Sequence, residues 1–236
     1  MSVLNTSLNE KEIDSIYEYQ NGDTLSLKNP GRGVRLSRKE RTMKKIELRL
    51  NRFLHGIRDY TDLKIIDPYL KTNPVILNDI PSMTPLEQKV YITSSKYGMR
   101  THPITKKKKA HLGYDLAAAM GSKVYATADG RVQLTKISNA GYGNYIEIKH
   151  RFGFETRYGH LSKILVVDNQ YVKQGDLIGL VGSTGLSTGP HLHYEIIKNG
   201  STIDPFVSFD IKYNYYKIAF ENKKKKSISN VATKQK

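Results

Sequence analysis

The chain has 236 residues, enough for one good-sized domain with extensions or for two small domains. A composition of 38% hydrophobic and 9% aromatic residues fits a globular protein, and the absence of cysteine excludes disulfides, cysteine catalysis and thiolate metal sites. Lysine and arginine number 38 against 22 aspartate and glutamate residues, so the net charge of +16 allows a nucleic acid, an anionic membrane surface or an acidic polymer as partner.

The first residues, MSVLNTSLNEKEID, do not show the basic start and apolar run of a secretory signal. No stretch approaches the roughly 18–20 consecutive apolar residues of a membrane helix. If the protein acts outside the cytoplasm, we expect an export segment that is missing from this sequence, or another export route.

The N-terminal 80 residues have the pattern of helices. Helices are predicted over about residues 8–20 and residues 37–60, and the second has an apolar stripe from Met43 to Ile57 at spacings of mostly three and four. Four X-Pro steps between Lys64 and Pro85 then indicate a connector. We therefore expect residues 1–80 to be a helical region and connector. Its apolar stripe must be buried against the following domain or against another chain.

Residues 81–210 have the pattern of short strands. Apolar residues recur with a period near two, and turn sequences separate the strands about every ten residues. The pattern predicts a mainly β domain, an antiparallel sandwich or twisted sheet. Residues 211–236 carry 8 basic residues and one acidic residue with little apolar content after Lys223, and they are expected to form a basic, disordered tail.

One candidate motif is His111-Leu112-Gly113-Tyr114-Asp115. In a straight strand at ~3.3 Å per residue, His111 and Asp115 would lie about 13 Å apart, too far to share a metal at bond lengths of ~2.0–2.2 Å. The chain must bend if both bind one ion, and Gly113 gives it the freedom to do so. Alone, H-x-x-x-D is a weak signal that often occurs by chance.

Two further motifs lie on predicted strands. In His191-Leu192-His193, both imidazoles should point to one face, with Leu192 turned into the core. In Tyr158-Gly159-His160, the same alternation predicts that Tyr158 and His160 share a face at the end of a strand. Zinc favours His and carboxylate ligands, and a catalytic site keeps three of them plus an open position. On spacing alone, a zinc site and a set of structural or surface histidines both remain open.

These motifs stand in the order found in one enzyme family. The chain resembles the lysostaphin-type (LytM-type) zinc peptidases, metallopeptidase family 23, over about residues 80–208. The resemblance is carried by YGMRTHP (97–103), HLGYDL (111–116), YGHL (158–161), the glycines of a hairpin at Gly175 and Gly179, and GSTGLSTGPHLHYE (182–195). It implies a twisted antiparallel β core of the duplicated hybrid motif type, whose groove holds one zinc ion.

By motif position, the resemblance implies that His111, Asp115 and His193 are the metal ligands and that His160 and His191 are the two catalytic histidines. His102 belongs to the same resemblance but matches no ligand, and His150 ends a predicted strand, so structural roles are expected for both. The implied function is hydrolysis of peptide crosslinks in bacterial peptidoglycan, at the cell envelope, in the periplasm or outside the cell. Glycyl bridges and D-alanyl–diaminopimelate crosslinks both remain open as substrates.

Three alternatives belong to other classes. A catalytically inactive module that activates another cell-wall hydrolase would typically have lost metal ligands, and here all three are present. A nucleic-acid-binding protein is suggested only by charge, because the lysine runs lack interleaved aromatic residues. A lipoyl-like carrier hairpin would need a modifiable lysine at its tip.

The N-terminal region could cover the groove, hold a partner hydrolase or a second copy of the chain, or act as a spacer.

Overall fold

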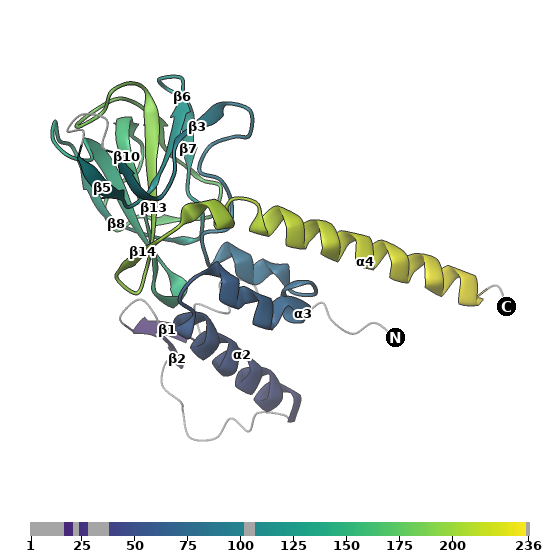
Figure 1. Cartoon of the computed structure of the whole chain (residues 1–236). Coiled ribbons are helices and arrows are strands. Elements are labelled where there is room, and N and C mark those ends of the chain that lie inside the picture. The colour runs from purple at the N-terminus through teal and green to yellow at the C-terminus, as the bar shows by residue number, and fades with distance from the viewer. Residues whose placement is uncertain (1–16, 21–23, 28–37, 102–106, 235–236) are drawn as a thin grey trace. The chain divides into compact units, whose positions relative to one another are not determined.

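The structure, a computed structural model, describes residues 17–20, 24–27, 38–101 and 107–234. It divides into two units, Met1–Gly56 and Ile57–Lys236, and each is described by itself below. Figure 1 labels their elements. The division falls at residue 56 rather than at the boundary of 80 expected from the sequence. None of the described helices combines the length and apolar character that a membrane span requires.

The described residues of the first unit form a strand pair and one helix. Strand β1 (Tyr17–Gln20) pairs antiparallel with β2 (Thr24–Leu27), and helix α2 spans Arg38–Gly56. The helix expected over residues 37–60 is therefore present. The helix expected over residues 8–20 is wrong at 17–20, where aromatic residues with strand propensity form β1, and its remainder lies outside the described residues. Along the apolar stripe Leu54 is buried but Ile46 is 43% exposed, so the stripe is buried only in part.

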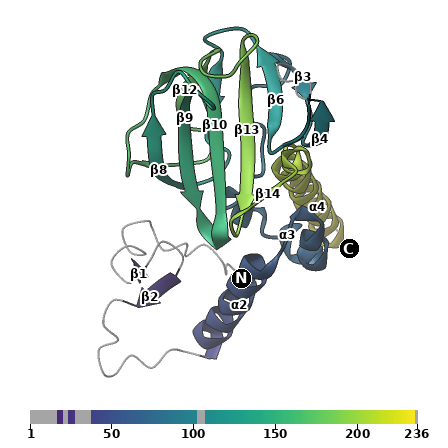
Figure 2. The same ribbon diagram turned by 60° about the vertical axis from the view of Figure 1, so that its left-hand side comes forward.

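The second unit is built on a ten-stranded antiparallel sheet. Its strands are β3 (Tyr91–Ser95), β6 (Tyr114–Ala118), β7 (Lys123–Tyr125), β8 (Gly130–Lys136), β9 (Asn144–His150), β10 (Phe154–Ile164), β11 (Tyr171–Val172), β12 (Leu177–Val181), β13 (His191–Lys198) and β14 (Ser201–Ile203). The main order is β11-β8-β9-β10-β13-β6-β3, as seen in Figure 2 for most of these strands. The predicted mainly β, antiparallel fold is confirmed.

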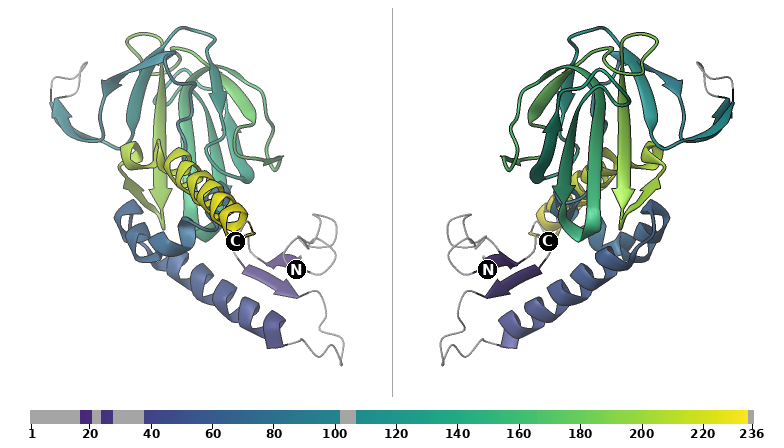
Figure 3. Two further views of the ribbon diagram at one scale, coloured as in Figure 1. Left: turned by 90° about the vertical axis from the view of Figure 1, so that its right-hand side faces the viewer. Right: turned by 90° about the vertical axis from the view of Figure 1, so that its left-hand side faces the viewer.

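A separate hairpin stands beside this sheet. Strands β4 (Gly98–Thr101) and β5 (Lys108–His111) pair antiparallel, with Gly98 opposite His111. Figure 3 shows the hairpin projecting next to the edge of the sheet. The end of β5 thereby carries His111 back to the sheet, where β6 begins three residues later.

The alternation of β13 separates the core from the opposite face of the sheet. Leu192, Tyr194 and Ile196 are fully buried, and the ring of Tyr194 packs 5.3 Å from that of Tyr158 on the neighbouring strand. A chain of buried hydroxyl groups continues from these tyrosines through Thr127. Since successive side chains of a strand point to opposite faces, His191, His193 and Glu195 lie on the other face.

The proline-spaced stretch that was expected to be a connector packs as part of the second unit. It forms 3-10 helix η1 (Tyr60–Ile66), helix α3 (Asp67–Leu70) and 3-10 helix η2 (Pro74–Asn78). Tyr60, Leu63, Leu70, Leu77 and Ile80 are buried. The Tyr60 ring lies 5.7 Å from that of Phe154, and Arg151 forms an ion pair of 2.8 Å with Asp79. Proline at the first turns of α3 and η2 is compatible with a helix because no N–H is needed there.

The C-terminal tail expected to be disordered forms a helix, α4 (Ile211–Lys234), so that prediction is corrected. Its first turns are fixed to the unit: the Lys212 N–H donates to the Ser82 carbonyl, and the Tyr215 hydroxyl donates to Asp67 at 2.9 Å. Lysine is also a good helix former, so a basic, weakly apolar composition does not by itself prevent a helix once its start is anchored. A short 3-10 helix, η4 (Pro205–Ser208), leads into it, and another, η3 (Arg151–Gly153), joins β9 to β10.

Candidate metal centre

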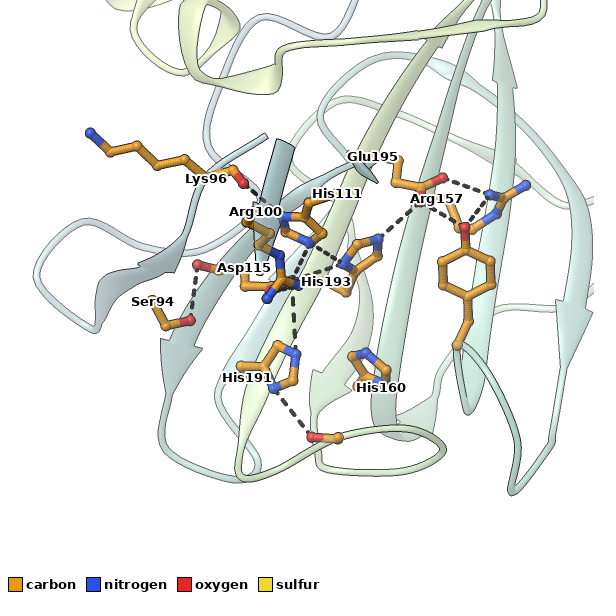
Figure 4. Close-up of polar contacts among 12 residues, drawn as sticks. Ser94, Lys96, Arg100, His111, Asp115, Arg157, His160, His191, His193 and Glu195 are labelled. Carbon is orange, nitrogen blue, oxygen red and sulfur yellow. Dashed lines mark hydrogen bonds and ion pairs between the residues drawn. The ribbon is translucent and has the colours of Figure 1, made fainter. Parts of the chain in front are cut away.

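Three side chains converge at one point, two from strands of the main sheet and one from the hairpin (Figure 4). His111 ends β5, Asp115 is the second residue of β6, and His193 is the third residue of β13. The register of β6 and β13 places Asp115 directly opposite His193. Gly113 allows the bend between His111 and Asp115 because it has no side chain, and not because of its backbone freedom. A Cβ there would lie 2.6 Å from the carbonyl oxygen of Tyr194 and 2.9 Å from His193 Cε1.

The geometry of these groups fits one metal ion. His193 Nδ1 lies 2.8 Å from Asp115 Oδ1, His111 Nε2 lies 3.1 Å from the same oxygen, and the two nitrogens are 3.2 Å apart. Three donors around a tetrahedral zinc at ~2.0–2.1 Å are about 3.3 Å from one another, so the observed separations need little change. All three side chains are buried, and among the described residues they form a His/Asp/His set that can hold a metal.

His111 and Asp115 each make a hydrogen bond with the atom that points away from the cluster, and this determines which of their atoms face it. His111 Nδ1 donates to the Lys96 carbonyl oxygen at 2.7 Å, which leaves its Nε2 lone pair directed at the cluster. Arg100 Nη2 lies 3.3 Å from Asp115 Oδ2, so Oδ1 is the carboxylate oxygen left for the ion. Burial alone would raise the pKa of Asp115, but its contacts with the His111 and His193 rings outweigh burial and hold that pKa well below its usual range.

His193 has a hydrogen-bond partner of its own. Its Nε2 donates to Glu195 Oε1 at 2.9 Å, and Glu195 in turn accepts from the Tyr142 hydroxyl at 2.7 Å and from Arg157 Nη1 at 2.6 Å. Burial would raise the pKa of Glu195, but the hydrogen bond and charge of His193, the Tyr142 hydroxyl and the Arg157 charge lower it, so the carboxylate is ionised. Sequence reasoning gave Glu195, Arg157, Tyr142 and Arg100 no role. The period of two along β13 could have placed Glu195 on the face of His193.

Two more histidines face this cluster from one side (Figure 4). His191 Nε2 lies 3.8 Å from Asp115 Oδ1, and its Nδ1 lies 2.8 Å from the Gly189 carbonyl oxygen. His160 Nδ1 donates to the Thr184 carbonyl oxygen at 2.7 Å, and its ring centre is 4.6 Å from that of His191. Because each Nδ1 hydrogen is donated to a carbonyl, the neutral form of each ring has its lone pair at Nε2. Burial, followed by the charges of His191 and His193, lowers the pKa of His160 to about 4, so its neutral form persists at pH 7.

The position of His160 corrects the expectation that it shares a face with Tyr158. Tyr158 is buried in the core, whereas His160 lies beside His191 on the opposite face. The reason is the backbone of His160, whose φ of +61° is unusual for a residue other than glycine and reverses the alternation. His160 lies where β10 changes partner, since its pairing with β13 ends at Gly159 and its pairing with β12 begins at Leu161.

All five residues line one groove with a volume of about 560 Å³. Its walls also include Ser94, Arg100 and Tyr142 and the loop residues Leu186 and Pro190. By contrast, His150 lies in the core, where its Nδ1 donates to the Asp129 carbonyl and its Nε2 accepts from Thr156. This agrees with the structural role expected for it, while His102 lies outside the described residues.

Similarity to known proteins places this site in a family. Residues 109–205 match the family model described as Peptidase family M23. Peptidoglycan DD-endopeptidase ShyA of Vibrio cholerae is 46% identical over 121 residues, which are 51% of this chain and 28% of that protein. DD-carboxypeptidase/endopeptidase Mpg of Neisseria meningitidis is 47% identical over 112 residues, 48% of this chain and 26% of that protein. The chain thus matches about a quarter of the length of these relatives.

The fold is also similar to that of a solved structure. The crystal structure of a zinc-containing peptidase from Vibrio cholerae has 38% sequence identity and a TM-score of 0.50, with 54% of this chain and 40% of that chain covered. An antiparallel sheet with a buried His/Asp/His set that can hold a metal, beside a groove, is the arrangement that a metallopeptidase requires. The chain belongs to peptidase family M23, with a lysostaphin-like domain, as the sequence motifs indicated.

Proposed function

We propose that this chain is a zinc-dependent endopeptidase that hydrolyses D,D peptide crosslinks of bacterial peptidoglycan. The observation that carries the proposal is the complete set of three buried donors, 2.8–3.2 Å apart, at the side of a groove that also contains two further histidines. The names of the relatives, a DD-endopeptidase and a DD-carboxypeptidase/endopeptidase, favour the D,D crosslink over a glycyl bridge.

We assign one zinc ion to His111 Nε2, Asp115 Oδ1 and His193 Nδ1. Two imidazoles and one carboxylate are a ligand set that zinc favours, and three protein ligands leave a position open in a catalytic site. When bound, zinc supplies Lewis-acid chemistry, polarising the scissile carbonyl and making a water molecule more acidic. The structure's own contribution is the orientation of each donor by Lys96, Arg100 and Glu195.

His191 and His160 are the proposed proton carriers. His191 is the better general base by position, because its Nε2 lies 3.8 Å from Oδ1 of the metal-binding residue Asp115. His160 is neutral at pH 7, so it can donate from Nε2 only after it has received the proton that His191 removes from water, and it then passes that proton to the leaving amine. The close approach of the two rings places both steps in one groove.

The experiment that tests the function uses sacculi of defined crosslink chemistry. Purified protein is incubated with sacculi that contain D-alanyl–diaminopimelate crosslinks or glycyl bridges, the glycan strands are then digested with a muramidase, and the products are identified by mass. We expect crosslinked muropeptides to be converted to monomers in the sacculi with D,D crosslinks only. Release from glycyl bridges alone would reassign the substrate, and no release from either by zinc-loaded protein would refute the endopeptidase proposal.

Substrate chemistry suggests the location and partner. Because peptidoglycan lies in the cell envelope, we propose that the protein acts there, periplasmically or extracellularly, with crosslinked stem peptides as its binding partner. The inactive-activator alternative predicts a missing ligand, whereas the described site has all three. We also propose that the N-terminal unit binds another hydrolase or a second copy of the chain. Measurement of the association state tests this part of the proposal.

A further inference from the structure

We propose that Glu195 is a positioning residue of the metal centre: held by Arg157 and Tyr142, it fixes the ring orientation and the donor nitrogen of His193. The inference deepens the proposed function and rests on it, because it takes His193 to bind the metal. It assigns a role to three residues that lie behind the ligands rather than among them.

The first step of the argument is the geometry of the His193 ring. A neutral imidazole has one N–H and one lone pair, so a partner at one nitrogen decides what the other can do. Glu195 Oε1 lies 2.9 Å from Nε2 and is a carboxylate oxygen, which can only accept. Asp115 Oδ1, 2.8 Å from Nδ1, is also a carboxylate oxygen, so without metal the ring can donate from both nitrogens. When a metal replaces the hydrogen at Nδ1, the contact with Glu195 keeps the remaining hydrogen at Nε2 and leaves the Nδ1 lone pair for the metal.

The second step is that Glu195 has little freedom to move. Its side chain is only 1% exposed, and both carboxylate oxygens are used. Oε2 forms an ion pair with Arg157 Nη1 at 2.6 Å, and Oε1 accepts from the Tyr142 hydroxyl at 2.7 Å. Arg157 and Glu195 are also direct register partners on β10 and β13, so the sheet itself holds them together.

The third step is that Tyr142 and Arg157 are fixed in turn. The Arg157 guanidinium lies 4.7 Å from the centre of the Tyr142 ring, donates to the Tyr142 hydroxyl at 3.1 Å and pairs with Glu147 at 2.7 Å. The Tyr142 ring centre is 5.4 Å from that of His193. An ion pair that only stabilised the fold would not need these contacts with a ligand. The bridge between Arg151 and Asp79 in the same unit has none of them and provides a matched control.

The test measures zinc affinity of the full chain by chelator competition, without reference to hydrolysis. We expect Glu195→Ala to weaken zinc binding 10- to 100-fold, the scale found for groups that orient metal-bound histidines. Glu195→Gln should recover part of the loss, because its amide oxygen can still accept from Nε2. Tyr142→Phe should have a smaller effect in the same direction. Asp79→Asn should change zinc affinity less than two-fold, although it also breaks a mostly buried ion pair.

A second readout separates positioning from general loss of stability. In the cobalt-substituted protein, the visible absorption bands report ligand geometry, and we expect them to shift in Glu195→Ala but not in Asp79→Asn. An unchanged spectrum with zinc affinity within two-fold of the parent would overturn the inference, as would an equal loss in Asp79→Asn. If Glu195→Ala does not fold, Glu195→Gln and Tyr142→Phe give the same comparison. A parent protein that binds zinc but cleaves no crosslink would refute the proposed activity and leave this inference standing, whereas a parent that binds no zinc would refute both.

Discussion

The main-chain N–H of His160 donates a hydrogen bond of 2.7 Å to the carbonyl oxygen of Tyr142. The bond joins the loop before β9 to strand β10, at a residue whose φ of +61° is costly for any residue other than glycine. The imidazole of His160 is held in the same region, by the carbonyl oxygen of Thr184. The strained position of this histidine therefore depends on the close packing of residues 141–143 against Thr184.

Gly143 tests that dependence. Its φ is +64°, and a Cβ there would lie 2.4 Å from the backbone and side chain of Thr184. We expect Gly143→Ala to destabilise the fold by more than the ~1–2 kcal/mol of a left-handed alanine, and to lower hydrolysis by displacing the carbonyl that holds His160. Urea unfolding and crosslink hydrolysis measure the two effects. Gly141→Ala is the control, because Gly141 also has positive φ (+53°) but nothing within 4 Å of its Cβ position. Equal activity in the two variants would contradict this account.

Removal of a ligand should remove metal and activity together. We expect Asp115→Ala and His193→Ala each to lose the bound zinc and all measurable hydrolysis, and a chelator to inactivate the parent reversibly, because two remaining ligands hold zinc poorly. Metal analysis of the purified variants and hydrolysis of sacculi are the measurements. Full activity of metal-free protein would refute the mechanism.

Replacement of a proton carrier should separate metal content from activity. We expect His191→Ala and His160→Ala to keep one zinc per chain and to lose about 100-fold or more in hydrolysis rate, the scale of a general acid–base group. His150→Gln, a change of a buried histidine away from the groove, is the control for side-chain loss. If either groove variant lost its zinc, the division between ligands and proton carriers would be wrong at that position.

His150 predicts a pH dependence of stability. Burial lowers the pKa of His150 to about 4 in the folded protein, against 6.5 when unfolded. Between these values the unfolded chain binds a proton that the folded chain does not. The free energy of unfolding should therefore fall as pH drops from 6.5 to 4, by on the order of 3 kcal/mol from this residue. Urea titrations at several pH values give the free energy of unfolding, and we expect it to change less steeply with pH in His150→Gln than in the parent. The same pH dependence in both proteins would show that His150 does not control it.

The unit boundary predicts how the chain can be shortened. Removing residues 1–56 should leave a folded zinc-binding protein with altered hydrolysis rate or association state if the first unit has a regulatory or partner-holding role. Removing residues 1–80 should cost several kcal/mol more, because five buried apolar side chains between Tyr60 and Ile80 are worth ~1.5–3 kcal/mol each. Thermal unfolding and size-exclusion chromatography compare the two lengths. Equal stability would show that the predicted connector is only a tether.

Local periodicity was enough to predict much of the site. The period of two along residues 191–193 places both imidazoles on one face and Leu192 in the core, and the structure confirms this arrangement. The order of the motifs around His111, Asp115 and His193 indicated the family and the antiparallel fold. These features are local or depend on residue identity, so they can be read from a single chain.

Tertiary structure decided what depends on contacts between distant segments. The pairing of β10 with β13 brings Arg157 to Glu195, and the loop after β8 supplies Tyr142, so these two partners of Glu195 have no local signal. The positive φ of His160 reverses a strand alternation that the sequence predicted to continue. Residues 57–80 and the start of α4 pack into the second unit because distant partners such as Phe154, Arg151 and Ser82 hold them. A proline-spaced or lysine-rich stretch looks the same in sequence whether or not such partners exist, because most of the stability of its helices comes from tertiary packing.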